Sequence, residues 1–168
     1  MNSGLFSRMM DMKPTHGTAR NWRVLMAVPD DPREADERIA NGLSLLDGTD
    51  RWSYALWRLP EDNPVRGLSH EGATEFLQSA GTAQRMTIEM MRHQSQPEDA
   101  YYLYAVGKPG GTTSLQDTTI TWAGKTTPVA ENEVYTAAEA AKVYAYYRKH
   151  DTVPPDSTLR LVDTFPVD

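Results

Sequence analysis

Cysteine is absent from this chain of 168 residues, and its absence excludes several kinds of chemistry. A disulfide framework, a thiolate nucleophile and a Cys-containing metal site all require this residue. The histidines offer no substitute, since none is spaced as metal ligands usually are, and no metal site is expected. They are His16, His70, His93 and His150. A cysteine-free chain fits a reducing compartment, so a cytoplasmic location is expected.

Long apolar runs and an excess of positive charge are also missing. No apolar stretch approaches the ~20 residues of a membrane-spanning helix. Residues 1–20 lack a continuous apolar segment, so no secretory signal is expected. Lys and Arg total 17 against 23 Asp and Glu, which gives a net charge of −6. This balance disfavours nucleic acid and anionic membrane surfaces as partners, whereas a basic protein would be attracted.

Motifs of common enzymes and nucleotide sites are not found. The chain contains no G-x-S-x-G, G-x-G-x-x-G or Walker pattern. The glycine-rich segment at residues 107–111 includes Lys108, but it lacks the ending that places a phosphate loop before a helix. A hairpin loop is therefore expected there. No nucleophile–base pair is visible, so neither catalytic residues nor a cofactor are expected.

Several short segments carry strand patterns of apolar and β-branched residues. We expect strands over residues 22–28, 52–59, 86–91, 101–106 and 158–162, and a hairpin of 118–122 with 126–129. Residues 1–21 show no clean periodicity and are expected to form a less regular N-terminal arm.

Helix signals occur at two strong positions and one weak one. An acidic residue before Pro32 is typical of a helix start, and Gly48 would end that helix. Thr136 and Glu139 form a capping-box pattern before an apolar face. A short helix is expected over 71–80. The order of elements predicts a single α+β domain over 1–168, with a twisted antiparallel sheet and two or three helices mostly on one face.

Two groups of side chains could serve binding or only structure. The helix that begins at Pro32 has many carboxylates in its first turns. They either stabilise the helix by interacting with its dipole or form an acidic patch for a basic partner. They are Asp30, Asp31, Glu34, Asp36 and Glu37. Trp and Tyr residues, which are common at interface hot spots, suit a core or an aromatic binding face.

The C-terminal segment, about residues 117–163, resembles small actinobacterial immunity proteins that neutralise polymorphic toxins, namely the family of the immunity factor for tuberculosis necrotizing toxin. The resemblance is carried by residues 132–141, the pair Tyr146–Tyr147, Val153–Pro154 and residues 158–160. It implies a non-enzymatic cytoplasmic antitoxin. Such a protein binds a secreted NAD-degrading (NAD glycohydrolase) toxin in a one-to-one complex and occludes its NAD pocket.

Two segments of the chain could protrude into a partner's pocket, residues 9–16 and 108–113. Each contains a lysine, which suits a pocket that binds dinucleotide phosphates. The toxin-binding candidates are Met10, Lys13, Lys108, Pro109 and Tyr146. Two alternatives remain open: a secretion chaperone or other protein-interaction module, and a small-molecule-binding or enzymatic α+β domain with a tyrosine-lined pocket.

Overall fold

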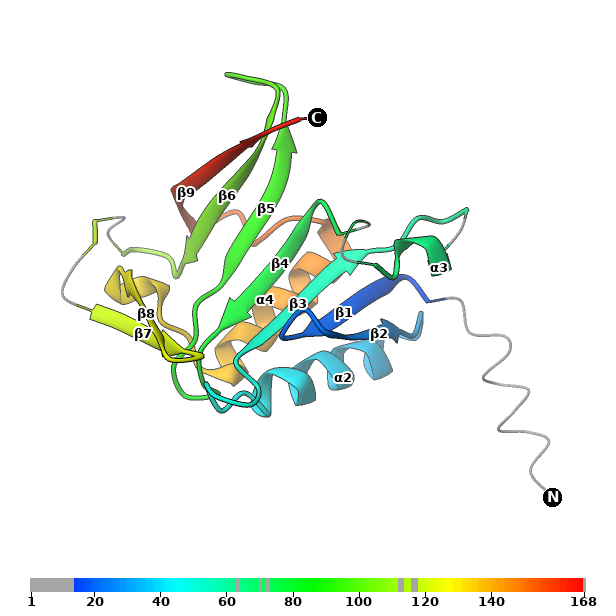
Figure 1. The fold of residues 1–168 in the computed structure, drawn as a ribbon, viewed down its shortest axis with the longest axis horizontal. Coiled ribbons are helices and arrows are strands. Elements are labelled where there is room, and N and C mark those ends of the chain that lie inside the picture. Colours follow the sequence, from blue (N-terminus) through cyan, green and yellow to red (C-terminus); the bar gives the residue numbers. More distant parts are fainter. Residues whose placement is uncertain are drawn as a thin grey trace.

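One antiparallel sheet of seven strands forms the centre of the fold (Figure 1). The computed structural model describes residues 14–62, 64–69, 71, 73–111, 114–115 and 118–167. The strands of the sheet, in spatial order, are β2 (Val24–Val28), β1 (His16–Arg20), β3 (Ser53–Arg58), β4 (Phe76–Ala80), β5 (Glu89–Gln94), β6 (Ala100–Gly107) and β9 (Thr158–Pro166). Each pair of neighbours is antiparallel. Strands β2 and β9 therefore form the two edges.

Two long helices, α2 (Pro32–Ser44) and α4 (Ala137–His150), pack against each other and against the same face of this sheet (Figure 1). Ile39 of α2, Leu77 of β4 and Tyr144 of α4 are almost fully buried in the core between them. The Tyr144 hydroxyl lies 3.0 Å from Ser79 Oγ and 3.2 Å from the Tyr54 carbonyl oxygen. The expected α+β domain, with its antiparallel sheet and helices on one face, is confirmed.

Both expected helix starts are confirmed by their caps. Asp31 Oδ1 accepts a hydrogen bond from the Glu34 amide at 2.9 Å, and Pro32 occupies the first turn. At α4, Thr136 Oγ1 accepts from the Glu139 amide at 3.3 Å, while Glu139 Oε2 accepts from the Thr136 amide at 3.1 Å. These bonds satisfy amide groups that have no partner within a helix.

The expected end of the first helix at Gly48 is wrong, because α2 ends at Ser44. Asp47 Oδ1 accepts hydrogen bonds from the amides of Thr49 at 2.8 Å and Arg51 at 2.9 Å. These hydrogen bonds direct the chain toward β3, so the helix does not continue to Gly48. Gly48 lies in the turn, with a φ of +80°.

The expected helix over 71–80 is also wrong, because Phe76–Ala80 is strand β4. Leu, Gln and Ala in this segment have high intrinsic helix propensity. However, β4 lies between β3 and β5 and pairs with both. Leu77 faces the core and is fully buried, whereas Phe76 points to the opposite face. Strand pairing and burial therefore outweigh local propensity.

Residues 16–20 do not belong to a less regular arm, as was expected for 1–21, but form the interior strand β1. Gly17 lies beneath the ring of Trp57 on β3, and a Cβ atom there would come within 2.6 Å of two ring carbons. The segment contains few of the bulky residues that are typical of strands. The large side chains that cover it come from the neighbouring strand β3, such as Trp57.

The expected hairpin is present as a separate two-stranded sheet, β7 (Thr118–Trp122) and β8 (Lys125–Val129). The Ala123 amide donates to the Gly48 carbonyl at 2.8 Å, which anchors the hairpin tip to the turn after α2. Arg85 Nη2 donates to the Thr119 carbonyl at 3.1 Å. The short helix α3 (Pro64–Gly67) and the 3-10 turn η1 (Glu131–Glu133) complete the described elements.

The face of the sheet opposite α2 and α4 is covered only in part. Trp57, Leu59 and Ala73 form a small second core over β1 and β3, with Trp22 and Phe76 packed against it. No described helix covers β5, β6 and β9 on this side, and these strands extend beyond the body as an arm (Figure 1). We call this side the helix-free face. Among the described residues, no helix is long and apolar enough to cross a bilayer.

Candidate binding site

A row of polar side chains crosses the helix-free face. The strand register pairs Gln78 of β4 with Glu89 of β5, and Glu89 with Ala105 of β6. Ala105 is paired in turn with Arg160 of β9. Residues paired in this way point to the same face of an antiparallel sheet. The small side chain of Ala105 therefore leaves space between Glu89 and Arg160.

Two adjoining cavities of about 250 Å³ and 240 Å³ meet at Glu89. Both are lined by Thr87, Glu89 and Thr127, so that β8 forms one wall of each. We call the pair the Glu89 hollow. One cavity extends toward three indole rings, and the other extends over Ala105 toward Arg160. Concave sites with a few convergent polar groups are the usual form of binding sites.

Glu89 is the carboxylate at the centre of this hollow. Gln78 Nε2 donates a hydrogen bond to Glu89 Oε2 at 2.7 Å, and this is its only hydrogen bond within the described chain. Burial raises the pKa of the Glu89 carboxyl, against the effects of the Gln78 bond and the Arg160 charge. A carboxylate with a raised pKa in a cavity is a recognised mark of a functional site.

The neighbouring cation, Arg160, is already paired. Its Nε and Nη2 atoms donate to the two oxygens of Glu133, each at 2.8 Å. Glu133 is buried on η1 and also accepts from the Ala130 amide at 2.9 Å. The hydrogen bond to Glu133 raises the pKa of Arg160. This ion pair ties η1 to β9, and it leaves Glu89 without an ion-pair partner among the described residues.

An unusual turn places Trp22 at the edge of the hollow. Asn21 and Trp22 connect β1 and β2 with φ angles of 53° and 54°, a left-handed conformation that suits Asn but is rare for a bulky residue. Asn21 Oδ1 accepts from the amides of Trp52 and Ser53 at 2.9 and 3.1 Å, which holds the turn. The Trp22 indole N–H donates to Gln78 Oε1 at 3.1 Å.

Trp52 and Trp122 line the hollow beside Trp22. Their rings lie 5.1 Å apart between centroids, and the Trp122 N–H donates to Thr127 Oγ1 at 2.9 Å. The Lys125 ammonium lies 5.1 Å from the centroid of the Trp122 ring. All three indoles are partly exposed. Half-exposed Trp side chains in a concave surface are typical of binding hot spots.

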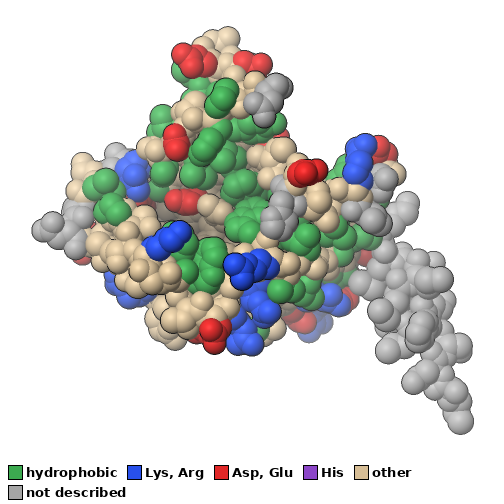
Figure 2. Space-filling model, in the orientation of Figure 1, with side chains coloured by type: hydrophobic (Ala, Val, Ile, Leu, Met, Phe, Trp, Pro, Cys, Tyr) green, Lys and Arg blue, Asp and Glu red, His purple; other side chains and the backbone are tan. Residues whose placement is uncertain are grey.

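The edge strand β9 leaves large apolar side chains exposed next to the hollow. Figure 2 shows hydrophobic side chains gathered over β5, β6 and β9. We call the exposed apolar residues Val162, Phe165 and Val167 of β9 and its continuation the open strip. Leu161 is also exposed, but it pairs with Tyr104 and points to the opposite face of the sheet. An exposed apolar edge strand promotes association with another chain unless it is protected.

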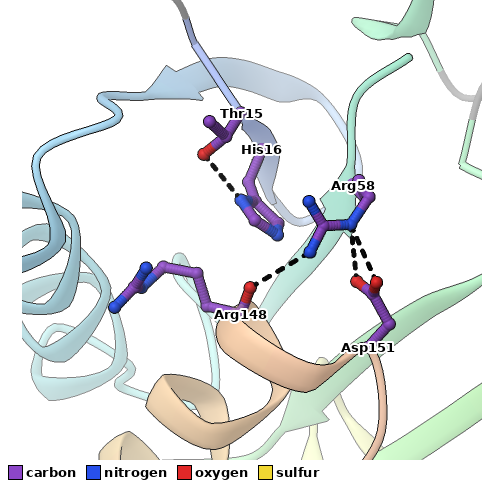
Figure 3. Close-up of polar contacts among 5 residues, drawn as sticks. All are labelled: Thr15, His16, Arg58, Arg148 and Asp151. Atoms are coloured by element: carbon purple, nitrogen blue, oxygen red, sulfur yellow. Dashed lines mark hydrogen bonds and ion pairs between the residues drawn. The ribbon is translucent and has the colours of Figure 1, made fainter. Parts of the chain in front are cut away.

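A second polar cluster lies under the C-terminal end of α4 (Figure 3). His16 is buried, with its Nδ1 atom 2.8 Å from Thr15 Oγ1. Arg58 Nε donates to both oxygens of Asp151 at 2.7 and 2.9 Å, and Arg58 Nη2 donates to the Arg148 carbonyl at 3.4 Å. Burial, reinforced by the Arg58 charge, lowers the pKa of His16 to about 4. The cluster joins β1, β3 and α4.

This second cluster is better explained by stability than by binding. A cavity of about 660 Å³ beside it is lined by charges of both signs, among them Arg58, Arg66, Glu75 and Asp151. Arg58 is already paired with Asp151. Arg66 lies 3.7 Å from Asp62.

The three described toxin-binding candidates lie away from the hollow and are not brought together. Lys108 Nζ forms an ion pair with Glu139 at 2.8 Å and lies 5.4 Å from the centroid of the Tyr135 ring. Its amide donates to the Asn132 carbonyl at 2.8 Å, so the start of the loop is fixed to η1. Pro109 is exposed in the following turn. Tyr146 is half-buried on α4, 4.3 Å from the ring of His150 between centroids.

Met10 and Lys13 lie outside the described residues, so the structure does not place these two candidates. The acidic group at the start of α2 is described, and three of its carboxylates pair with arginines. Glu34 pairs with Arg38, Glu37 with Arg33, and Asp36 with Arg148. Much of this group is thus neutralised within the chain.

Sequence reasoning did not single out Gln78 or Glu89, and it named Arg160 only as part of the resembling segment 158–160. Gln78 was assigned to a helix, and Glu89 occupied a polar position of an alternating strand that normally faces water. The partial signal was Trp22 followed by Arg23, where a tight strand-to-strand turn contains a bulky ring instead of glycine.

Comparisons with known proteins give no assignment. No protein-family model, curated protein or solved structure matches the chain. Within the described residues, no group of three or more His, Asp or Glu side chains is placed to hold a metal ion. The geometry of the helix-free face is therefore the main basis for a functional proposal.

Proposed function

We propose that this chain is a protein-binding inhibitor of the immunity type, which covers the active site of a cognate toxin with its helix-free face. The toxin class is that implied by the C-terminal resemblance, a secreted NAD-degrading enzyme. The complex is one-to-one and forms in the cytoplasm, and the chain itself carries out no reaction.

The observation that carries the proposal is the open strip beside the Glu89 hollow. Val162 and Phe165 are 43% and 41% exposed on an edge strand of nine residues, where isolated domains usually avoid long apolar edges. Stable complexes bury roughly 1,600 Å² in total, and a face that combines apolar strip, indoles and carboxylate suits such an interface. The net charge of −6 favours a basic partner surface.

The location differs from the protruding loops expected from sequence. Lys108 is engaged by Glu139 and Tyr135, so its ammonium would have to leave two partners before it could enter a toxin pocket. The helix-free face needs no such rearrangement. The Lys108 loop stays a candidate contact at the margin of the interface.

The test is loss of NAD in the presence of a necrotizing-toxin domain, with and without an equimolar amount of this protein. We expect suppression at a one-to-one ratio and a single complex on size exclusion. A V162D/F165D variant should weaken inhibition by at least about 100-fold, because each substitution places a charge in the apolar contact.

The opposite edge of the sheet supplies a matched control. Val24 and Met26 on β2 are 43% and 55% exposed, close to the 43% and 41% of Val162 and Phe165. A V24D/M26D variant should inhibit within about threefold of the unaltered protein. Equal loss in both variants would assign the effect to general damage, and full NAD loss with no complex would remove this toxin class as the target.

A further inference from the structure

We propose that the Glu89 hollow binds one cationic group, the guanidinium or ammonium of a basic side chain that the partner protein inserts between Glu89 and the surrounding indoles. Only the source of the cation rests on the proposed function. The recognition itself follows from the charge, the ring walls and the shape of the hollow, each of which belongs to this chain alone.

The charges around the hollow favour a cation over an anion. Two carboxylates, Glu89 and Glu133, face a single guanidinium in the row across the sheet. Arg160 donates both of its hydrogen bonds in this row to Glu133. The Glu89 carboxyl group thus lies in a confined space with one neutral hydrogen-bond donor, Gln78. An added cation would pair with it, whereas an anion would meet two carboxylates.

The indole rings that line the hollow also favour a cation. Indole rings attract cations over their faces, and the attraction grows when water is removed. Hydrogen bonds to Gln78 and Thr127 hold Trp22 and Trp122 by their N–H groups, which fixes the direction of both rings. Trp122 already has the Lys125 ammonium 5.1 Å from its ring centroid, so its surroundings accept a positive charge.

The size of the hollow suits the end of a single side chain. The cavity bounded by the indoles has a volume of about 250 Å³, with Glu89 at one end of its lining. Such a space admits the end of one long side chain rather than a folded segment. Gln78 links the two recognition elements, because its oxygen accepts from Trp22 while its amide nitrogen donates to Glu89.

The experiment uses the four tryptophans as reporters. The probe is acetyl-arginine-N-methylamide, and the control ligand is the citrulline analogue, which has the same shape without the charge. Binding is followed by the indole N–H signals in a ¹⁵N–¹H spectrum. The signals of Trp22, Trp52 and Trp122 should move with the arginine probe. Trp57, whose buried N–H donates to the Gly67 carbonyl at 2.8 Å, should move least.

Two variants and one control variant assign the effect. E89Q should weaken binding of the arginine probe at least tenfold, and W122L should weaken it severalfold. E98Q removes an exposed carboxylate from the loop before β6 and should leave binding unchanged. Equal shifts with arginine and citrulline, or binding by E89Q equal to that of the unaltered protein, would overturn the proposal.

The two proposals fail in different ways. Arginine binding at Glu89 together with undiminished NAD loss would retain the cation site and reject the toxin class. Toxin inhibition that E89Q leaves intact, with no arginine binding, would retain the inhibitor and reject the cation site. Inhibition that falls at least tenfold in E89Q but not in E98Q would support a partner side chain as the source of the cation.

Discussion

The two faces of the central sheet treat buried polar groups differently. Under α2 and α4, the buried Tyr144 hydroxyl has two oxygen partners, and the surrounding side chains are apolar and fully enclosed. On the helix-free face, Glu89 has one hydrogen bond and the three indoles of its hollow remain partly exposed. The enclosed packing of the first face suits a stabilising role, whereas the open polar hollow of the second face suits recognition.

The largest expected effect compares two adjacent residues of β4 that point to opposite faces. Leu77→Ala should lower the free energy of unfolding by about 2–5 kcal/mol, because it leaves a cavity in an enclosed core. Phe76→Ala should cost less, since Phe76 is only half-buried and packs edge-on to Trp22. Urea unfolding of both variants measures the difference. A larger loss for Phe76→Ala would reverse the assignment of the two faces.

An acid-dependent effect should come from the helix-covered face. His16 has a folded pKa of about 4 against an ordinary value of 6.5, so it favours folding fully above pH 6.5. That contribution is lost as the pH falls toward 4, by roughly 3 kcal/mol in total. Unfolding of the unaltered protein and of His16→Gln at a series of pH values should show this additional loss of stability toward pH 4 only in the unaltered protein. Parallel curves for the two proteins would rule out His16 as the cause.

A smaller effect of opposite sign is expected from the helix-free face. Because the pKa of Glu89 is raised in the folded protein, its ionised form opposes folding. Its contribution to stability is therefore fully present below the ordinary pKa of 4.5, and it is lost as the pH rises through the pKa of the folded protein. E89Q should match the unaltered protein near pH 4 and melt a few degrees higher at pH 8. Thermal unfolding at both pH values tests this, with E98Q as the control. A lower Tm for E89Q at pH 8 would mean that Glu89 supports the fold.

Local patterns predicted the elements that have strong boundary signals. The caps at Asp31 and Thr136 lie at the expected helix starts, and the hairpin of β7 and β8 is where alternation placed it. Strands β1 and β4 were missed for a common reason. Both lie inside the sheet, where neighbouring strands supply pairing and burial that a short window of sequence does not contain.

The candidate site was beyond prediction because it depends on register. Gln78, Glu89 and Arg160 are far apart in the chain and meet only through the pairing of four strands. The sequence also does not show that Arg160 forms an ion pair with Glu133. Because of this ion pair, Arg160 is not the partner of Glu89 at the centre of the hollow. The aromatic binding face was left open as an alternative, but no periodicity relates Trp22, Trp52 and Trp122.

The small side chain of Ala105 leaves an open space within the row of polar residues. Ala105 lies between Glu89 and Arg160 in the register, and its side chain is all that fills the gap on β6. A valine or leucine at this position would fill the cavity on the Arg160 side of Glu89 and leave the indole-lined cavity open, because Ala105 lines only the first of the two. The size of the hollow can therefore change through a single residue that belongs to neither core cluster.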